Sequence, residues 1–363
     1  MKIGIDARLL SETGVGRYVR NLIRELSVID KENEYIVFLR RNAFDVFQAP
    51  NGRWSKRLVD VPWHSITEQI VLPWLFFREH LDLLHVPYFN APILYPGKYI
   101  ITIHDLTILH FDTGKASTLP YWLYKIRRIG YRLVLSLGIK RASHILCVSH
   151  TVKNDVIAQF HKSSKEVSVT YEGVDPVFTQ KKSLRKNTVS EKYLLYVGNV
   201  YPHKNIDTLL NAYEIYAKKS AHPQKLVFVG PNDYFYEKLK QQVASKFYAH
   251  RVLFFHGLSD EVIKVLYADA SALLFPSLME GFGLPAIEAL TMRCPVICSD
   301  IPIFHEILGV HATYVNAKLP DDMARAIIYI SSKAKSHQDI ADLSLKFSLR
   351  KMAEETLAVY ETT

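Results

Sequence analysis

The chain has 363 residues, of which 48% are hydrophobic and 22% are charged, and its formal net charge at pH 7 is +9. This length predicts about two domains, since single domains usually run to ~100–200 residues, and the composition is that of an ordinary globular protein. It contains no apolar run near the ~18–20 residues of a membrane-spanning helix, and residues 1–6 have a strand pattern in place of a signal-peptide layout.

The three cysteines and the distribution of charge indicate the cellular compartment and the kinds of partner to expect. Cys147, Cys294 and Cys298 cannot all pair, and each lies in or beside an apolar run, so buried reduced thiols in a cytoplasmic protein are expected. Residues 113–154 contain no acidic residue. No nucleic-acid-binding motif accompanies this basic field, so nucleic acid is not an expected partner. The cations of the field are Lys115, Lys125, Arg127, Arg128, Arg132, Lys140, Arg141 and Lys153.

The first half of the chain alternates strand and helix patterns. Strands are expected at 2–6, 34–39, 57–61, 81–86, 99–104, 143–149 and 167–170. A loop with Gly14 and Gly16 precedes a helix over 19–26. Another helix covers 66–78, where Pro73 must kink it or lie near its start. A long helix over 117–141 mixes aromatic and basic residues, which suits either a domain helix with a solvated basic face or a helix lying on an anionic membrane.

The second half repeats the alternation after a polar, basic segment, 179–192, which has the composition of a linker. Strands are expected at 193–197, 226–230, 252–257, 271–275, 295–298 and 313–315, and a final helix at 347–360. Asn205 is expected to cap the helix that follows it. Repeated strand–helix alternation in both halves predicts an α/β fold with parallel sheets covered on both faces.

The most informative stretch is 276–288, Pro-Ser-Leu-Met-Glu-Gly-Phe-Gly-Leu-Pro-Ala-Ile-Glu. It joins a buried strand to a helix through two glycines, which let backbone approach a ligand closely. The free N–H groups of a helix start favour an anion such as phosphate. Carboxylates repel phosphate, so Glu280 and Glu288 are expected to accept hydrogen bonds from hydroxyl groups. A ligand with phosphate in the middle and hydroxyls at both ends is a nucleotide sugar.

This stretch resembles the E-x-F-G-x-x-x-x-E element of retaining glycosyltransferases of family 4. The resemblance extends over nearly the whole chain through four other motifs: G-V-G-R-Y at 14–18, T-I-H-D-L at 102–106, G-V-D-P-V-F at 173–178 and H-K-N at 203–205. It implies the GT-B architecture, two Rossmann-like domains whose parallel sheets face a central cleft. The implied boundaries are 1–178 for an acceptor-side domain, 179–192 for the linker, 193–345 for a nucleotide-sugar domain, and 346–363 for a helix that crosses back to the first domain.

The same resemblance assigns roles to individual residues. His104 and Glu280 are implied to lie at the reacting sugar, and Glu288 to hold the ribose. Asp105 is a weaker candidate, because it also suits a cap of the following turn. Lys204 is the expected cation at the diphosphate, although Asn199 and His203 stand where some members have arginine. The remaining donor-binding residues implied are Gly14, Gly16, Phe282, Gly283 and Leu284.

The implied activity is transfer of a hexose, with mannose or a rhamnose-like sugar favoured, from a nucleotide-diphospho-sugar such as GDP-mannose to a glycan or lipid-linked acceptor. The setting is bacterial polysaccharide or lipopolysaccharide assembly, with the enzyme in the cytoplasm or at the inner face of an anionic membrane. No Asp-x-Asp motif lies in a suitable loop, so neither a metal nor another cofactor is expected. Two alternatives stay open: a GT-B-type nucleotide-sugar epimerase, and a non-catalytic nucleotide-sugar-binding scaffold.

Overall fold

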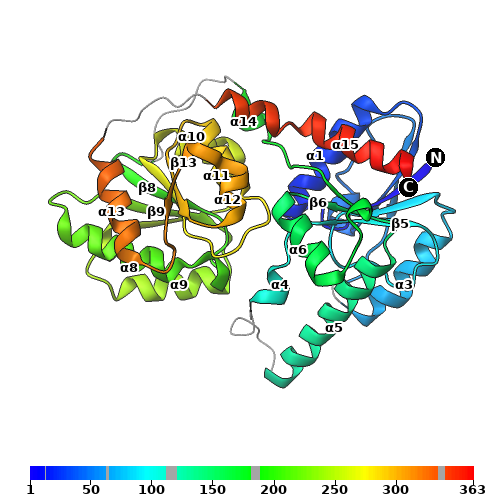
Figure 1. Cartoon of the computed structure of the whole chain (residues 1–363), viewed down its shortest axis with the longest axis horizontal. Coiled ribbons are helices and arrows are strands. Elements are labelled where there is room, and N and C mark those ends of the chain that lie inside the picture. The colour runs from blue at the N-terminus through cyan, green and yellow to red at the C-terminus, as the bar shows by residue number, and fades with distance from the viewer. Residues whose placement is uncertain (13, 63–64, 112–120, 181–188, 334–339) are drawn as a thin grey trace. The chain divides into compact units, whose positions relative to one another are not determined.

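The computed structural model describes residues 1–12, 14–62, 65–111, 121–180, 189–333 and 340–363. The chain forms two compact units. The first comprises Met1–Leu109, Leu119–Gly173 and Phe347–Thr363, and the second comprises His110–Thr118 and Val174–Lys346 (Figure 1). The predicted residues 117–120 of the long helix, residues 181–188 of the linker and Lys115 lie outside the described residues.

The first unit is built on a parallel sheet with the strand order β3-β2-β1-β4-β5-β6-β7. Its described strands are β1 (Lys2–Asp6), β2 (Glu34–Leu39), β3 (Trp54–Leu58), β4 (Leu83–Val86), β5 (Tyr99–Ile103), β6 (His144–Cys147) and β7 (Val167–Val169). Its helices are α1 (Gly14–Ile29), α2 (Arg41–Phe44), α3 (Ile66–Phe77), α5 (Tyr121–Arg141), α6 (His150–Phe160), α15 (Leu349–Thr362) and the short turn η2 (Ser164–Glu166), while α4 (Thr107–His110) ends at the boundary of the unit.

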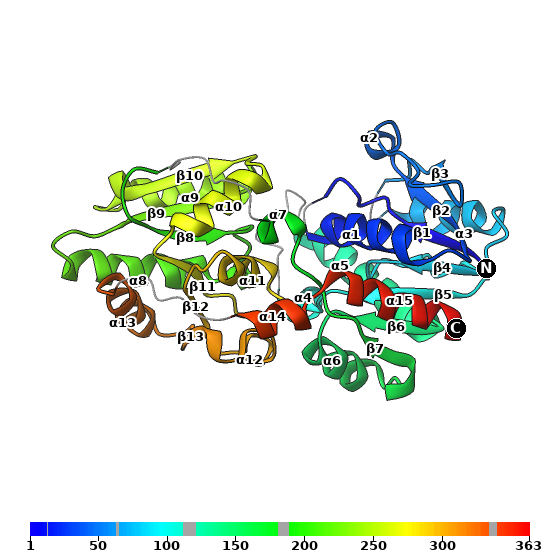
Figure 2. The same ribbon diagram turned by 90° about the horizontal axis from the view of Figure 1, so that it is seen from above.

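The helices cover both faces of this sheet. Since parallel crossovers are right-handed, the reversal of strand order at β1 and β4 puts α1 on one face and α3, α5 and α6 on the other. Helix α15 packs against α1, and Figures 1 and 2 show both over the same face of the strands. None of the helices in the described part of the chain is long and apolar enough to cross a membrane.

The second unit is a parallel sheet with the order β10-β9-β8-β11-β12-β13. Its described strands are β8 (Tyr193–Val197), β9 (Lys225–Gly230), β10 (Val252–His256), β11 (Ala272–Phe275), β12 (Val296–Ser299) and β13 (Ala312–Val315). Its helices are α7 (Pro176–Thr179), α8 (Ile206–Lys219), α9 (Tyr234–Ala244), α10 (Asp260–Asp269), α11 (Leu284–Thr291), α12 (Pro302–Leu308), α13 (Pro320–Ser331) and α14 (Ala341–Lys346), with short turns η3 (Pro202–Lys204), η4 (Ala249–Arg251) and η5 (Gly309–His311).

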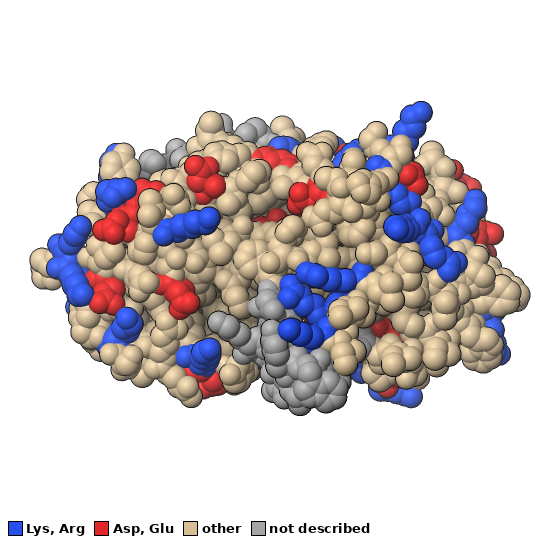
Figure 3. All heavy atoms as spheres, turned by 60° about the horizontal axis from the view of Figure 1, so that its bottom comes forward, with Lys and Arg blue, Asp and Glu red and all other residues tan. Residues whose placement is uncertain are grey.

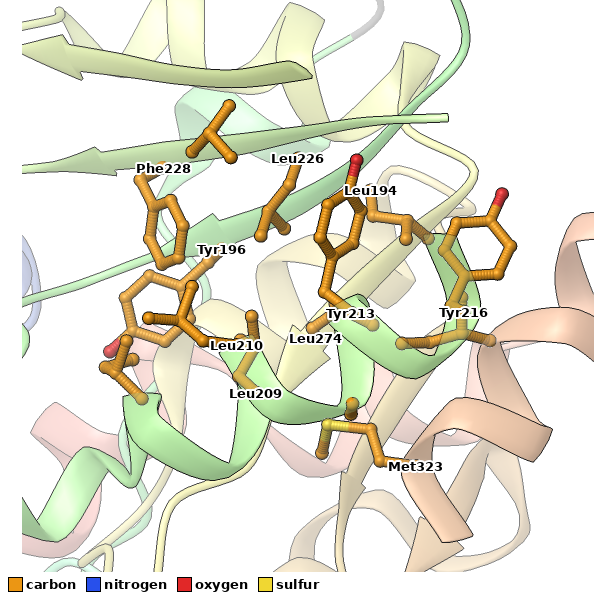
Figure 4. Packing of buried hydrophobic residues seen from close by; sticks show 14 of the residues in the cluster. Leu194, Tyr196, Leu209, Leu210, Tyr213, Tyr216, Leu226, Phe228, Leu274 and Met323 are labelled. Atoms are coloured by element: carbon orange, nitrogen blue, oxygen red, sulfur yellow. The ribbon is translucent and has the colours of Figure 1, made fainter. Parts of the chain in front are cut away.

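The core of the second unit explains why its strands are apolar throughout. All five residues of β8 are buried, because helices cover the sheet on both sides. Tyr213 and Tyr216 of α8 pack with Leu194 of β8 and Leu226 of β9, and Met323 of α13 closes the cluster (Figure 4). The predicted α/β class, with two parallel sheets between helices, is confirmed. Cys147, Cys294 and Cys298 are all buried, as predicted.

One local prediction needs correction, and a second is narrowed. The edge strand expected at 57–61 is β3, Trp54–Leu58, because the Asn51 side chain accepts from Arg53 N and starts the strand earlier. The Trp54 ring then stacks on Tyr35 of β2, with 4.1 Å between ring centroids. Pro73, expected to kink the helix or lie near its start, is buried in the second half of α3, so the position near the start is excluded and the kink stays a prediction.

A buried polar network ties α15 to the first sheet. His85 on β4 contacts the Tyr360 hydroxyl of α15 through Nδ1 at 2.6 Å and the Thr102 hydroxyl of β5 through Nε2 at 2.7 Å. Burial, with a further contribution from His104, lowers the pKa of His85 from 6.5 to about 3. His85 is therefore neutral in the folded protein at every pH near neutrality.

His85 should make the free energy of unfolding depend on pH. Below pH 6.5 the unfolded chain binds a proton that the folded chain does not, so stability falls as pH falls from 6.5 towards 3. From pH 7.5 to 5.5 the loss from this one group is about 1.4 kcal/mol. Urea unfolding at both pH values measures it, and His85→Gln should remove that part of the slope. An unchanged slope in the variant would show that other groups carry the dependence.

Candidate active site

The predicted donor residues of the second unit lie on two loops that follow neighbouring strands. The chain leaves β8, passes through η3, and starts α8 after Asn205. The amide of Asn205 donates to Pro276 O at 3.2 Å and to Ala317 O at 2.7 Å, which fixes this loop against the end of β11. The predicted capping role of Asn205 is wrong, because the residue is left-handed at φ 58° and its side chain caps no backbone N–H of α8.

Lys204 and Glu280 meet at this point. Lys204 Nζ lies 2.6 Å from Glu280 Oε1, and their side chains are only 13% and 12% exposed. The Ser277 hydroxyl donates to the same carboxylate oxygen at 2.7 Å, and Leu278 N donates to His203 O at 2.8 Å. The structure thus brings together the expected phosphate cation and the expected sugar-binding carboxylate, held in one geometry by their neighbours.

Glu280 leads directly into the glycine loop and α11. Gly283 has φ 93°, a conformation that other residues rarely adopt, and a Cβ there would lie 3.1 Å from the Phe304 ring. Phe282 is buried, so its side chain belongs to the core of the loop. Helix α11 begins at Leu284, where its first backbone N–H groups have no partner within the helix and favour an anion.

Glu288 lies one turn into α11 and is buried. Its carboxylate accepts a hydrogen bond from the Tyr267 hydroxyl of α10 at 3.1 Å. Tyr267 was not predicted as part of the site, because one tyrosine in an amphipathic helix pattern carries no sequence signal. This contact fixes the orientation of the Glu288 carboxylate.

In the first unit, His104 follows β5 and is held on three sides. Its Nδ1 lies 2.8 Å from Glu172 Oε1 and its Nε2 lies 3.2 Å from Pro87 O, while the Tyr18 ring meets it edge-on at 4.9 Å. The sequence prediction missed Glu172, which follows β7 and directly precedes the G-V-D-P-V-F motif at 173–178.

The neighbouring acid has a different role. The Asp105 carboxylate accepts from Thr107 N at 2.7 Å and thereby orders the start of α4. This is the capping role that the sequence left open for Asp105.

Burial raises the pKa of Tyr18 well above its ordinary value, so the group beside the His104 ring is a neutral phenol.

Gly14 and Gly16, expected in a loop, are the first and third residues of α1. The helix starts earlier because Gly16 packs against the backbone of the preceding turn. A Cβ on Gly16 would lie 2.5 Å from Leu9 O and 2.8 Å from Leu10 O, whereas a Cβ on Gly14 would meet nothing within 4 Å. Gly16 therefore has a packing reason to be glycine, and Gly14 has none.

These two glycines give a matched pair of variants. Gly16→Ala should cost about 1–3 kcal/mol of stability through overpacking, measured by chemical denaturation. Gly14→Ala should leave the fold intact, since alanine is the better helix former, but it should raise KM for the donor if the diphosphate approaches that backbone. A stable Gly14→Ala variant with unchanged KM would remove Gly14 from the donor site.

The chain was compared with known proteins. The family model "Glycosyltransferase Family 4" matches residues 13–178, and "Glycosyl transferases group 1" matches residues 178–344. The O-antigen chain mannosyltransferase RfbU of Salmonella typhimurium is 30% identical over 331 residues, covering 88% of this chain and 87% of the relative. The O-antigen chain mannosyltransferase B of Escherichia coli is 26% identical over 319 residues, covering 82% and 81%.

Solved structures show the same fold at lower identity. The structure of Anabaena Alr3699/HepE in complex with UDP and glucose aligns with a TM-score of 0.75 at 14% identity, covering all of both chains. The apo lipopolysaccharide outer core galactosyltransferase WaaB aligns with a TM-score of 0.66 at 16% identity, also over all of both chains.

The two-sheet α/β fold, of GT-B type, and these matches define a glycosyltransferase. The chain belongs to glycosyltransferase family 4, with the mannosyltransferases of O-antigen assembly among its relatives.

Proposed function

We propose that this protein is a retaining hexosyltransferase that moves mannose, or a related hexose such as rhamnose, from a nucleoside-diphosphate donor of the GDP-mannose kind to a glycan or lipid-linked acceptor. The observation that carries the proposal is the Lys204–Glu280 pair beside the start of α11. It combines a cation and helix N–H groups for a diphosphate with a fixed carboxylate for sugar hydroxyls. The two O-antigen chain mannosyltransferases support the choice of sugar.

In this mechanism the bond between the anomeric carbon and the donor diphosphate breaks, and a bond to the acceptor oxygen forms on the same face of the sugar. The acceptor proton passes to the departing phosphate oxygen. Lys204 and the first N–H groups of α11 stabilise the charge that develops on the diphosphate. Glu280 orients the sugar and Glu288 the ribose. His104, with Glu172 fixing its ring, faces the transferred sugar.

In this proposal the protein groups alone stabilise the negative charge that develops on the diphosphate as the bond to the sugar breaks. The proposed reaction therefore needs no metal ion. EDTA should then leave the rate unchanged, whereas loss of activity that Mg²⁺ or Mn²⁺ restores would contradict this part.

The proposed setting is polysaccharide or lipopolysaccharide assembly at the cytoplasmic face of a membrane, where a lipid-linked acceptor would be available.

The first test is a thermal-shift screen against GDP, UDP, ADP and dTDP sugars, with Glu288→Ala measured in parallel. A donor at ~100 times its Kd should add about 2.7 kcal/mol to stability, and Glu288→Ala should lose this gain. A donor that binds is then incubated with acceptor glycans, and the anomeric configuration of the product is read by NMR. An inverted product would contradict a retaining mechanism, and an isomerised donor would indicate an epimerase. A thermal shift without any product would indicate a non-catalytic nucleotide-sugar-binding scaffold, and no shift with any donor would contradict the proposed function.

A further inference from the structure

The tyrosine of the G-V-G-R-Y motif packs against the candidate reacting histidine. Tyr18 lies on α1, is 3% exposed, and meets the His104 ring at 84° with 4.9 Å between the ring centroids. The contacts of His104 with Glu172 and Pro87 are both made by its ring nitrogens. These contacts hold the line through the two nitrogens, but they limit the tilt of the ring about that line least. The nearly perpendicular Tyr18 ring limits that tilt.

Tyr18 is in turn held by a buried chain of polar groups. Its hydroxyl lies 3.3 Å from the Thr102 hydroxyl of β5, which lies 2.7 Å from Nε2 of His85 on β4. The other ring nitrogen of His85 lies 2.6 Å from the Tyr360 hydroxyl of α15. Thr102, His85 and Tyr360 are fully buried. We call these four residues the Tyr18–Tyr360 chain, and it joins α1, two neighbouring strands and α15.

The Tyr18–Tyr360 chain carries no charge. Burial raises the pKa of Tyr18 well above its ordinary value and lowers the pKa of His85 to about 3, so both are neutral near pH 7. Burial also raises the pKa of Tyr360. Charged side chains are common on the surface, as Figure 3 shows for one face of the molecule, but none belongs to this chain. The chain therefore acts on His104 through position, and brings no charge of its own.

The backbone places this chain directly behind the site. Thr102 and His104 are two residues apart, which is the spacing of side chains that share one face of a strand. His85 is also close enough for His104 to contribute to its lowered pKa. A displacement of about 1 Å at a reacting group can cost about 100-fold in rate, so a small shift of the Tyr18 ring would be measurable at His104.

We propose that Tyr18 positions His104 for the transfer reaction, and that the rest of the Tyr18–Tyr360 chain keeps the Tyr18 ring in place. Tyr18 is a positioning residue in this arrangement, because it acts on the reaction through His104. The inference rests on the proposed function, which puts His104 at the transferred sugar. It also gives helix α15 a part in the reaction, because Tyr360 is the last member of the chain.

The test compares two substitutions of Thr102 by steady-state kinetics with the donor found in the thermal-shift screen. Thr102→Val keeps the shape but removes the hydroxyl, and it should lower kcat about tenfold or more with KM for the donor unchanged. Thr102→Ser keeps the hydroxyl and should retain most of kcat, although it loses a buried methyl group. Tyr18→Phe removes the other hydroxyl of the same contact and should lower kcat as well. The control is Tyr213→Phe in the second unit, a buried phenol that donates to Gln224 O at 2.6 Å, which should leave kcat unchanged.

A second readout does not depend on turnover. Histidine-ring NMR detects the Cε1–H group of His104, whose chemical shift depends on the position of the neighbouring Tyr18 ring. The signal is assigned by its loss in His104→Ala. It should move in the Thr102→Val, Tyr18→Phe and Tyr360→Phe variants, whereas Tyr213→Phe should leave it in place. A His104 signal that does not move in Thr102→Val overturns the inference.

The His104→Ala variant separates this inference from the proposed function. If it turns over like the parent, the proposed role of His104 fails, and the positioning inference fails with it. If His104→Ala is slow while Thr102→Val and Tyr18→Phe keep the parent kcat, only the positioning inference is overturned. Equal losses of kcat in Thr102→Val and Thr102→Ser would assign the effect to packing and overturn the role of the polar chain.

Discussion

Replacing Lys204 with methionine is expected to lower kcat by about 10²–10³-fold, the usual effect of removing one preorganised charge-stabilising group. The methionine keeps most of the apolar stem but removes the cation that lies 2.6 Å from Glu280. The loss should appear mainly in kcat, since the charge on the diphosphate grows as the bond breaks. Steady-state kinetics with the donor found in the thermal-shift screen provides the measurement.

The control is Lys218→Met on α8, a lysine in an exposed pair with Glu214 that should leave kcat unchanged. Lys204→Met also leaves the Glu280 carboxylate with one partner fewer, so part of its effect could come through Glu280. The double variant Lys204→Met/Glu280→Gln separates the two, because residues in contact show non-additive effects. An unchanged kcat in Lys204→Met would exclude Lys204 from the reaction.

Replacing Arg8 with methionine is expected to cost about 3–5 kcal/mol of the free energy of unfolding, as when one partner of a buried ion pair is removed. Arg8 lies 2.7 Å from Asp6 of β1 and 2.8 Å from Glu68 of α3. Burial opposes its charge, but the two carboxylates outweigh this and raise the pKa of Arg8. Without the guanidinium, two carboxylates would remain buried and uncompensated.

Chemical denaturation of the variant measures this cost. Arg24→Met, which removes an exposed pair with Glu25, is the matched control and should change stability by less than about 1 kcal/mol. Arg8→Met/Glu68→Leu should recover part of the loss, because it removes one of the stranded charges. Equal stability of the Arg8 and Arg24 variants would show that the buried network is not needed to hold α3.

The sequence predicted the architecture because the fold rests on periodic patterns. Apolar runs such as 193–197 are strands buried on both faces, and their regular alternation with helices leaves parallel sheets as the outcome. The first residue of a helix was harder to predict from the sequence. Nothing in the pattern around Gly16 showed that the preceding turn packs against it, so α1 begins earlier than predicted.

For the candidate site, the sequence predicted the residues of the glycine loop but not the contacts that hold them. Lys204 and Glu280 were predicted as separate ligand contacts, and their ion pair depends on two loops meeting in space. Glu172 and Tyr267 have no motif of their own, and only the fold places them against His104 and Glu288. The left-handed Asn205 shows the same limit, since its side chain serves a neighbouring loop.

The path of the chain through the first unit has a consequence for its synthesis. Leu349, Met352 and Tyr360 of α15 belong to the same core as Ile3 and Ile5 of β1. All of the second unit is translated before these residues of α15. During that time the first sheet is synthesised but lacks the part of its core that α15 supplies. We therefore expect the second unit to reach its native packing before the first. A nascent chain stopped before residue 347 should have a first unit with an exposed apolar core, to which chaperones bind.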